Sequence, residues 1–138
     1  MLIHGLASII IAAVAYPFYG WNVSLIVAGG VLIDIDHYVW YILKYGKLSM
    51  AGCYRHFMVD GKANDFKDVT GIILIFHTIE FLAAMLILSG FSLFAFLFAM
   101  GVLAHYLLDL LWLYLYPKRF ICNHSIIHWI YKNKIQKV

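Results

Sequence analysis

The chain has 138 residues, of which 64% are hydrophobic and only 12% are charged, with a formal net charge of +3. Soluble domains carry about 25% charged residues, so this composition excludes an ordinary soluble globule, a disordered protein and a nucleic-acid-binding domain. An integral membrane protein fits instead, and an aromatic content of 17% agrees, because Trp and Tyr gather at membrane interfaces. At this length we expect a single membrane domain, 1–138.

Four apolar stretches follow one another along the chain, near residues 2–18, 23–43, 71–88 and 91–116. Each is close to the ~20 residues that a helix needs to cross a bilayer. The sequence therefore predicts an all-α, polytopic protein, built as a compact bundle of about four transmembrane helices. The first stretch lacks Lys and Arg, which favours an uncleaved helix over a signal peptide.

All ten Lys and Arg residues lie in two polar regions, five in the loop 44–70 and five in the tail 117–138. With four helices, both regions fall on the same side as the N-terminus, and the positive-inside rule predicts that this side is cytoplasmic. We therefore expect a multi-pass protein of the inner (plasma) membrane with cytoplasmic termini. The tail mixes Lys with apolar residues and is expected to lie in the membrane surface as a basic segment that includes His124 and His128.

Acidic and histidine residues occupy unexpected places within the apolar stretches. A carboxylate in hydrocarbon costs several kcal/mol by most estimates, so such residues point to function. Four of the seven acids are of this kind: Asp34, Asp36, Glu80 and Asp109. Histidines accompany them in the same stretches: His4, His37, His77 and His105. Cys53 and Cys122, by contrast, form no metal or redox motif.

The spacing of these residues predicts that they meet. His105 and Asp109 are four apart, whereas His77 and Glu80, like Asp34 and His37, are three apart, so each pair shares one helix face. Counted from the cytoplasmic helix ends, the pairs lie at depths of about 9–17 Å. His4, at the start of the first stretch, approaches the same side, so four segments are expected to converge on one layer.

Asp36 does not share the face of Asp34 and His37. Either it serves another partner, or the backbone is irregular there. Gly29 and Gly30, just upstream, would permit a close helix approach or a distortion.

Clustered imidazoles and carboxylates suit Zn²⁺, Mn²⁺ or Fe²⁺, and a cation offsets the repulsion between buried acids. We expect one or two divalent ions, zinc first, with seven candidate ligands: His4, Asp34, Asp36, His37, His77, His105 and Asp109. Glu80 is a candidate general base or a support for a ligand, and Asp36 is a second candidate catalytic residue. Arg55 and His56 are candidates to bind an anionic lipid head group.

These residues resemble a known family, the bacterial and archaeal membrane-bound metal-dependent hydrolases of the LexA-binding, inner-membrane-associated type. The resemblance spans residues 4–117 and rests on His4, Asp34-Ile35-Asp36-His37, His77, His105-Tyr106-Leu107-Leu108-Asp109 and Pro117. It implies a metal-dependent hydrolase, in the style of zinc-dependent phospholipase C. The sequence departs from the family pattern at Arg55-His56-Phe57 and Phe76-His77-Thr78, where the family usually has His-Arg-Gly and Thr-His-Ser.

The expected function is therefore hydrolysis of a lipid-linked phosphate or ester at the cytoplasmic membrane face, with membrane lipid as partner and no nucleic acid. Two alternatives stay open. A metal or proton transporter would need polar residues across the full membrane depth. A non-catalytic membrane protein with a structural metal would use the same ligands.

Overall fold

The computed structural model describes residues 2–60, 72–115 and 122–135, and helices dominate it, which confirms the all-α class. Two parallel strands of two residues each, β1 (Ile72–Ile73) and β2 (Cys122–Asn123), form a small ladder. Residues 61–70 of the predicted loop and 117–121 and 136–138 of the predicted tail lie outside the described residues, as do residue 71 of the third apolar stretch and residue 116 of the fourth.

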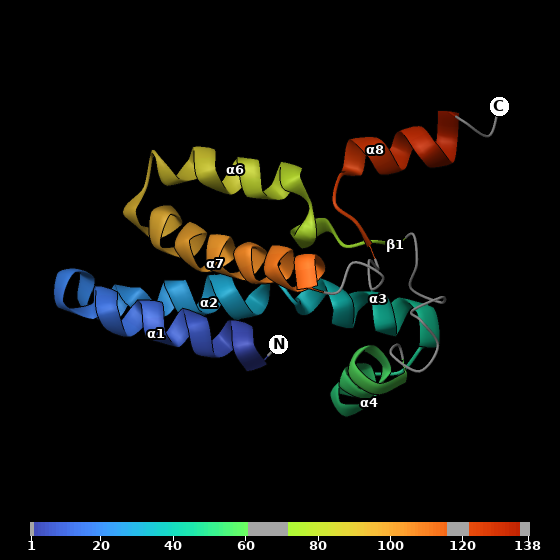
Figure 1. Ribbon diagram of the computed structural model, residues 1–138, viewed down its shortest axis with the longest axis horizontal. Coiled ribbons are helices and arrows are strands. Elements are labelled where there is room, and N and C mark those ends of the chain that lie inside the picture. The colour runs from blue at the N-terminus through green and yellow to red at the C-terminus, as the bar shows by residue number, and fades with distance from the viewer. Residues whose placement is uncertain (1, 61–71, 116–121, 136–138) are drawn as a thin grey trace.

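The first half of the chain forms a helical hairpin. Helix α1 (Leu2–Tyr19) ends after Pro17, and the 3-10 turn η1 (Gly20–Val23) leads into α2 (Ser24–Leu32). Gly20 has a φ of 56°, a conformation that a residue without a Cβ adopts at no steric cost. Figure 1 shows α1 and α2 side by side, running in opposite directions. Ala12, Ala15, Val23 and Ile26 of this hairpin form an apolar core together with Leu97 from the later helix 93–115.

The second predicted helix, 23–43, is interrupted. A turn at Ile33 and Asp34 separates α2 from α3 (Ile35–Tyr45), because the Asp34 N–H bonds to the Val31 carbonyl and the His37 N–H to the Asp34 carbonyl, both at a spacing of three residues. An irregular backbone, one of the two explanations considered above for the position of Asp36, is therefore present. After α3 come α4 (Met50–Arg55) and the π-helical turn η2 (His56–Asp60), which pack against α3 through Cys53 and Phe57.

The second half is another hairpin, formed by α6 (Ile79–Ser89) and α7 (Leu93–Leu115). A 3-10 turn, η3 (Ile75–His77), and the extended residue Thr78 precede α6. The expectation that His77 and Glu80 share a helix face is therefore wrong. The hydroxyl of Thr78 accepts a hydrogen bond from the Phe81 N–H and starts the helix after His77.

Glycines allow α2 and α7 to approach very closely. A Cβ on Gly101 would lie 2.0 Å from the Ile26 carbonyl oxygen, and one on Gly29 would lie 2.2 Å from the Phe98 carbonyl oxygen. The obstacle in both cases is backbone, which cannot move aside as a side chain can. This approach also brings α7 to the end of α2, where the candidate site lies.

We expect Gly101→Ala to lower the free energy of unfolding by roughly 1–3 kcal/mol, because the added methyl forces α2 and α7 apart. Thermal unfolding of the purified protein in detergent measures the change. Gly5→Ala is the matched control, since its Cβ would meet only the Val31 methyl at 3.8 Å. A Gly101→Ala protein as stable as the Gly5→Ala protein would contradict this packing.

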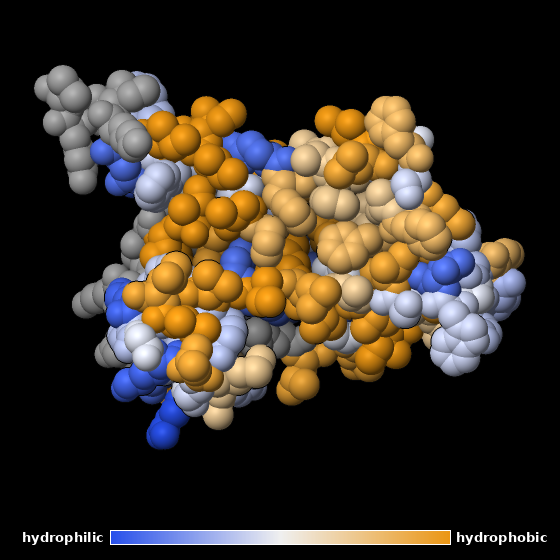
Figure 2. Space-filling model, turned by 180° about the vertical axis from the view of Figure 1, so that it is seen from behind, coloured by the Kyte–Doolittle hydropathy of each residue, from blue (hydrophilic) through white to orange (hydrophobic). Residues whose placement is uncertain are grey.

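The exterior is largely apolar. Figure 2 shows hydrophobic residues covering most of one face, and large side chains such as Phe18, Trp21 and Phe91 are more than three-quarters exposed. Two helical segments, Leu2–Tyr45 and Leu93–Leu115, are long and apolar enough to cross a membrane, and α6 is a shorter apolar helix. Among the described residues these two segments confirm only part of the expected bundle of four membrane-spanning helices.

The helices place four separate parts of the chain at one end of the molecule. The start of α1, the α2–α3 turn, the turn before α6 and the last half of α7 all meet there (Figure 1). The short strand β2 leads to α8 (Ile126–Ile130) and the π-helical turn η5 (Tyr131–Ile135) at the same end.

Candidate metal centre

The structure brings all seven predicted ligands together at this end of the molecule. They come from α1, the α2–α3 turn, the start of α3, η3 and α7: His4, Asp34, Asp36, His37, His77, His105 and Asp109. Two groups of three, His4–His105–Asp109 and Asp34–His37–His77, each have donor atoms within 4.8 Å of one another and could hold a metal ion. Residues that the sequence placed at a similar depth on separate helices therefore lie close together in the structure.

Four donor atoms converge most closely. The two Nε2 atoms of His77 and His105 lie 3.3 Å apart. Asp34 Oδ1 lies 3.5 Å from His77 Nε2 and 3.6 Å from His105 Nε2. Asp109 Oδ2 lies 3.8 Å and 3.5 Å from the same two nitrogens. A tetrahedral zinc with bonds of about 2.0–2.2 Å separates its ligand atoms by about 3.3–3.6 Å, and the three distances among Asp34, His77 and His105 lie in this range, as does that from His105 to Asp109. The distance from His77 to Asp109, 3.8 Å, is slightly longer.

Hydrogen bonds at the other ring nitrogens orient both imidazoles. His105 Nδ1 lies 2.9 Å from the Gly30 carbonyl oxygen, and His77 Nδ1 lies 3.0 Å from Asp36 Oδ2. Because both partners are acceptors, each Nδ1 carries a proton, and each Nε2 of a neutral ring presents a lone pair. With both rings neutral, the two Nε2 lone pairs would face each other at 3.3 Å and repel, so the arrangement calls for a cation there: a metal ion between the rings, or a proton on one Nε2 that makes the contact a hydrogen bond.

Asp36 lies beside the four donors and has its oxygens occupied by protein nitrogens. Its Oδ2 accepts from the Phe76 N–H at 3.1 Å as well as from His77, and its Oδ1 lies 3.0 Å from His37 Nδ1. This position suits Asp36 to orient the two histidines. His37 Nδ1 is also 3.6 Å from Asp34 Oδ1, which makes His37 a candidate for a second ion.

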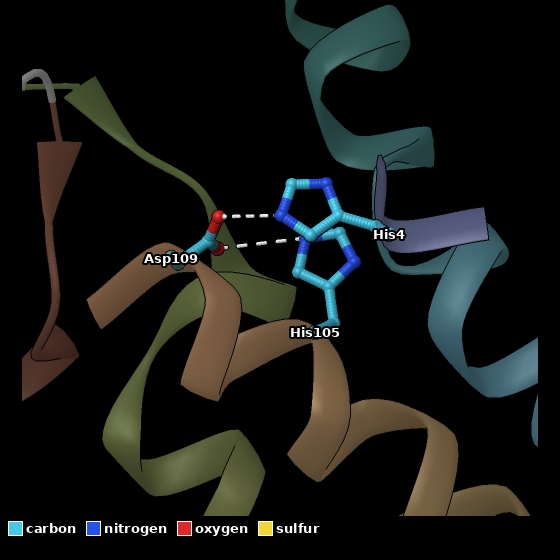
Figure 3. Close-up of side chains that lie close together, drawn as sticks. All are labelled: His4, His105 and Asp109. Carbon is cyan, nitrogen blue, oxygen red and sulfur yellow. Dashed lines mark ion pairs between the residues drawn. The ribbon is translucent and has the colours of Figure 1, made fainter. Parts of the chain in front are cut away.

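His4 closes the opposite side of the cluster. Its Nε2 lies 3.2 Å from Asp109 Oδ1, and its ring stacks on that of His105 with centroids 4.0 Å apart. Figure 3 shows His4 and His105 stacked, with both rings directed toward the Asp109 carboxylate. The Asp109 carboxylate therefore faces His4 with one oxygen and the four-donor centre with the other.

Exposure is uneven across the centre. The side chains of His105, His77 and Asp34 are 1%, 7% and 13% exposed, whereas that of Asp109 is 34% exposed. Asp109 is therefore the most exposed of the four donors.

The structure does not bring the other predicted site residues to this centre. The Glu80 carboxylate accepts hydrogen bonds from the Ser125 hydroxyl and from the N–H groups of Ile126 and Ile127. Its direction follows from the helix start at Thr78, which turns residue 80 away from residue 77. The His56 ring packs among the rings of Trp40, Tyr41, Tyr45 and Phe57, and Arg55 is exposed at the end of α4.

Sequence reasoning missed two groups that support the centre. The Tyr106 hydroxyl donates to the carbonyl oxygens of Phe76 and Thr78 and so fixes the turn that carries His77. The Phe57 ring packs edge-on against the His37 ring at 4.9 Å. Neither Tyr106 nor Phe57 differs in the sequence from the many aromatic residues around it, so no pattern singled them out.

Comparison with known proteins finds no matching family model, no matching curated protein and no matching solved structure.

Proposed function

We propose that the protein is a membrane-embedded, metal-dependent hydrolase that cleaves a lipid-linked phosphate or ester at the cytoplasmic membrane face. The observation that carries this proposal is the pair of buried imidazoles whose Nε2 atoms face each other at 3.3 Å between two carboxylates. Zinc is the first candidate ion, with manganese or iron(II) as alternatives, and the number of ions is one or two. The four-residue Asp-x-Asp-His element at 34–37, which resembles the membrane-bound metal-dependent hydrolases, lies within this centre.

The proposed arrangement in the membrane is multi-pass, with both termini cytoplasmic. It is supported by the gathering of the N-terminus, the α2–α3 turn and the end of α7 at one end of the molecule (Figure 1), the side on which the sequence concentrates Lys and Arg. Helix α6 has only 11 residues, so in this proposal β1 and η3 complete the third of the four crossings. Such irregular backbone is tolerated at membrane depth where it lines a protein site.

Each residue of the centre has a role in the proposal. A divalent ion bound here would polarise a phosphoryl or carbonyl oxygen and make water a stronger nucleophile. In this proposal the ligands that hold it are Asp34, His77 and His105, the three most buried of the four converging donors. Asp109 is the proton acceptor, because its Oδ2 faces the centre from the exposed side while His4 holds its Oδ1.

The second candidate is a structural metal. Four protein donors at tetrahedral distances are typical of closed structural zinc sites, whereas catalytic sites keep one position for water or substrate. In that case Asp109 is the fourth ligand rather than a base. The transport alternative is less well supported, because the core beyond the centre is formed by apolar residues of α1, η1, α2 and α7.

The hydrolase proposal is tested with purified protein in lipid nanodiscs that contain phosphatidate or another phospholipid. We expect release of inorganic phosphate, head group or fatty acid, loss of that activity with a zinc chelator, and recovery with added Zn²⁺. Metal-loaded protein that cleaves none of these bonds would overturn the hydrolase proposal and leave the structural metal.

A further inference from the structure

We propose that the segment from β2 to the start of α8 (residues 122–127) is a positioning element for His77, and that Glu80 is the residue that fastens it. The inference rests on the proposed metal centre, of which His77 is a part. It gives Glu80 a role different from the general base that its place in an apolar stretch first indicated.

Glu80 holds the start of α8 with both of its carboxylate oxygens. Its Oε1 accepts from the Ser125 hydroxyl at 2.6 Å and from the Ile127 N–H at 3.3 Å, and its Oε2 accepts from the Ile126 N–H at 3.1 Å. N–H groups at the start of a helix have no partner within the helix, so an acceptor from outside satisfies them. The Ser125 hydroxyl oxygen caps the start of α8 by accepting a hydrogen bond from the His128 N–H.

Backbone contacts extend this attachment on the N-terminal side of Glu80. The Ile79 N–H donates to the His124 carbonyl at 2.8 Å, and β1 pairs with β2 through Ile72 and Ile73. The segment therefore lies alongside the chain on both sides of His77. Residues of α6, α8 and η5 border an open groove of about 560 Å³, whose lining includes Glu80, Ser125 and Tyr131. Figure 1 shows α8 projecting away from the two helical hairpins.

The turn that carries His77, η3, is fixed on its other side to the metal centre. Asp36 accepts from the Phe76 N–H and from His77 Nδ1, and the Tyr106 hydroxyl donates to the carbonyls of Phe76 and Thr78. His77 thus ends the single 3-10 turn η3, and that turn is held from two directions. The turn's own hydrogen bonds, from the His77 N–H to the Leu74 carbonyl and from the Thr78 N–H to the Ile75 carbonyl, fix its local shape, whereas its place relative to Asp36 and α7 depends on the external contacts.

The chemistry of Glu80 predicts a graded effect of substitution. Glu80→Gln keeps one acceptor oxygen but loses the charge and the second oxygen, whereas Glu80→Ala removes all three hydrogen bonds of the Glu80 side chain and leaves the backbone contacts of Ile79 and β1 in place. Partners that orient a metal-bound histidine commonly contribute 10–100-fold to metal affinity. We expect Glu80→Ala to weaken metal binding by about 10–100-fold and Glu80→Gln to weaken it less.

The experiment titrates Co²⁺ into the metal-free full-length protein in detergent and records its visible absorption spectrum. We expect Glu80→Ala to weaken Co²⁺ binding and alter the spectrum, with Glu80→Gln intermediate. Ser125→Ala should weaken binding in the same direction, and combined with Glu80→Ala it should add little, because the two side chains act through one contact. Asp60→Ala, an exposed acid at the end of η2, is the control.

Three outcomes are decisive. Graded Co²⁺ affinities with altered spectra support the positioning role. Variants that lose only thermal stability, while affinity and spectrum stay at the wild-type values, overturn it and leave Glu80 a purely structural residue. A wild-type protein that binds no Co²⁺ overturns the metal centre itself, and the positioning role falls with it.

Discussion

Asp34→Asn is expected to remove stoichiometric metal from the purified protein. Asp34 Oδ1 is within 3.6 Å of three imidazole nitrogens, on His37, His77 and His105, so it is the acid most central to the donor set. An amide has nearly the same shape but no charge and is a poorer zinc ligand. Since loss of an orienting partner alone costs 10–100-fold, loss of this ligand should weaken binding by more than about 100-fold.

Elemental analysis gives the metal content, and thermal unfolding with and without a chelator gives its contribution to stability. A bound ion stabilises the folded state by mass action, so the wild-type melting temperature should fall with chelator while that of Asp34→Asn should not respond. Asp60→Asn is the matched control, because Asp60 is exposed at the end of η2. A full complement of metal in Asp34→Asn would remove Asp34 from the ligand set.

Asp109→Asn is expected to retain the ion and to lower the rate of hydrolysis by roughly 10²–10⁴-fold. The reason is that the two carboxylate oxygens of Asp109 have different neighbours. Its Oδ1 lies 3.2 Å from His4 Nε2, whereas its Oδ2 faces the Nε2 atoms of His77 and His105. An amide keeps the shape but cannot accept a proton from water. Turnover of the lipid substrate and metal content, measured on the same preparation, test both halves of the expectation.

The same variant distinguishes the hydrolase from a structural metal site. If Asp109 is the fourth ligand of a closed site, Asp109→Asn loses the ion together with thermal stability. That result would contradict the role of Asp109 as proton acceptor.

The convergence of the site could be predicted because it depends on distances along helices. His105 and Asp109 lie on an unbroken part of α7, and four-residue spacing places them on one face, as the structure shows. His4 lies on a similarly regular helix, α1. The apolar composition likewise indicated an all-α protein with segments able to cross a membrane.

Irregular backbone limited the rest of the sequence-based reasoning. The turn at Asp34 and the helix start at Thr78 each change the direction of the following side chains, and both fall within continuous apolar runs that resemble uninterrupted helix. Glu80 therefore points to the α8 start rather than to His77. Its partner Ser125 lies 45 residues further along the chain, a separation that no local pattern encodes.

In the proposed centre, one ion is held by nitrogen and oxygen donors from three separate parts of the chain, and the two nitrogen donors are the Nε2 atoms of His77 and His105. X-ray absorption at the zinc edge of the metal-loaded protein tests this directly. The structure predicts nitrogen and oxygen neighbours at about 2.0–2.2 Å, with the outer scattering pattern of two imidazoles. A sulfur neighbour at about 2.3 Å, or an ion surrounded by oxygen without imidazole scattering, would contradict it.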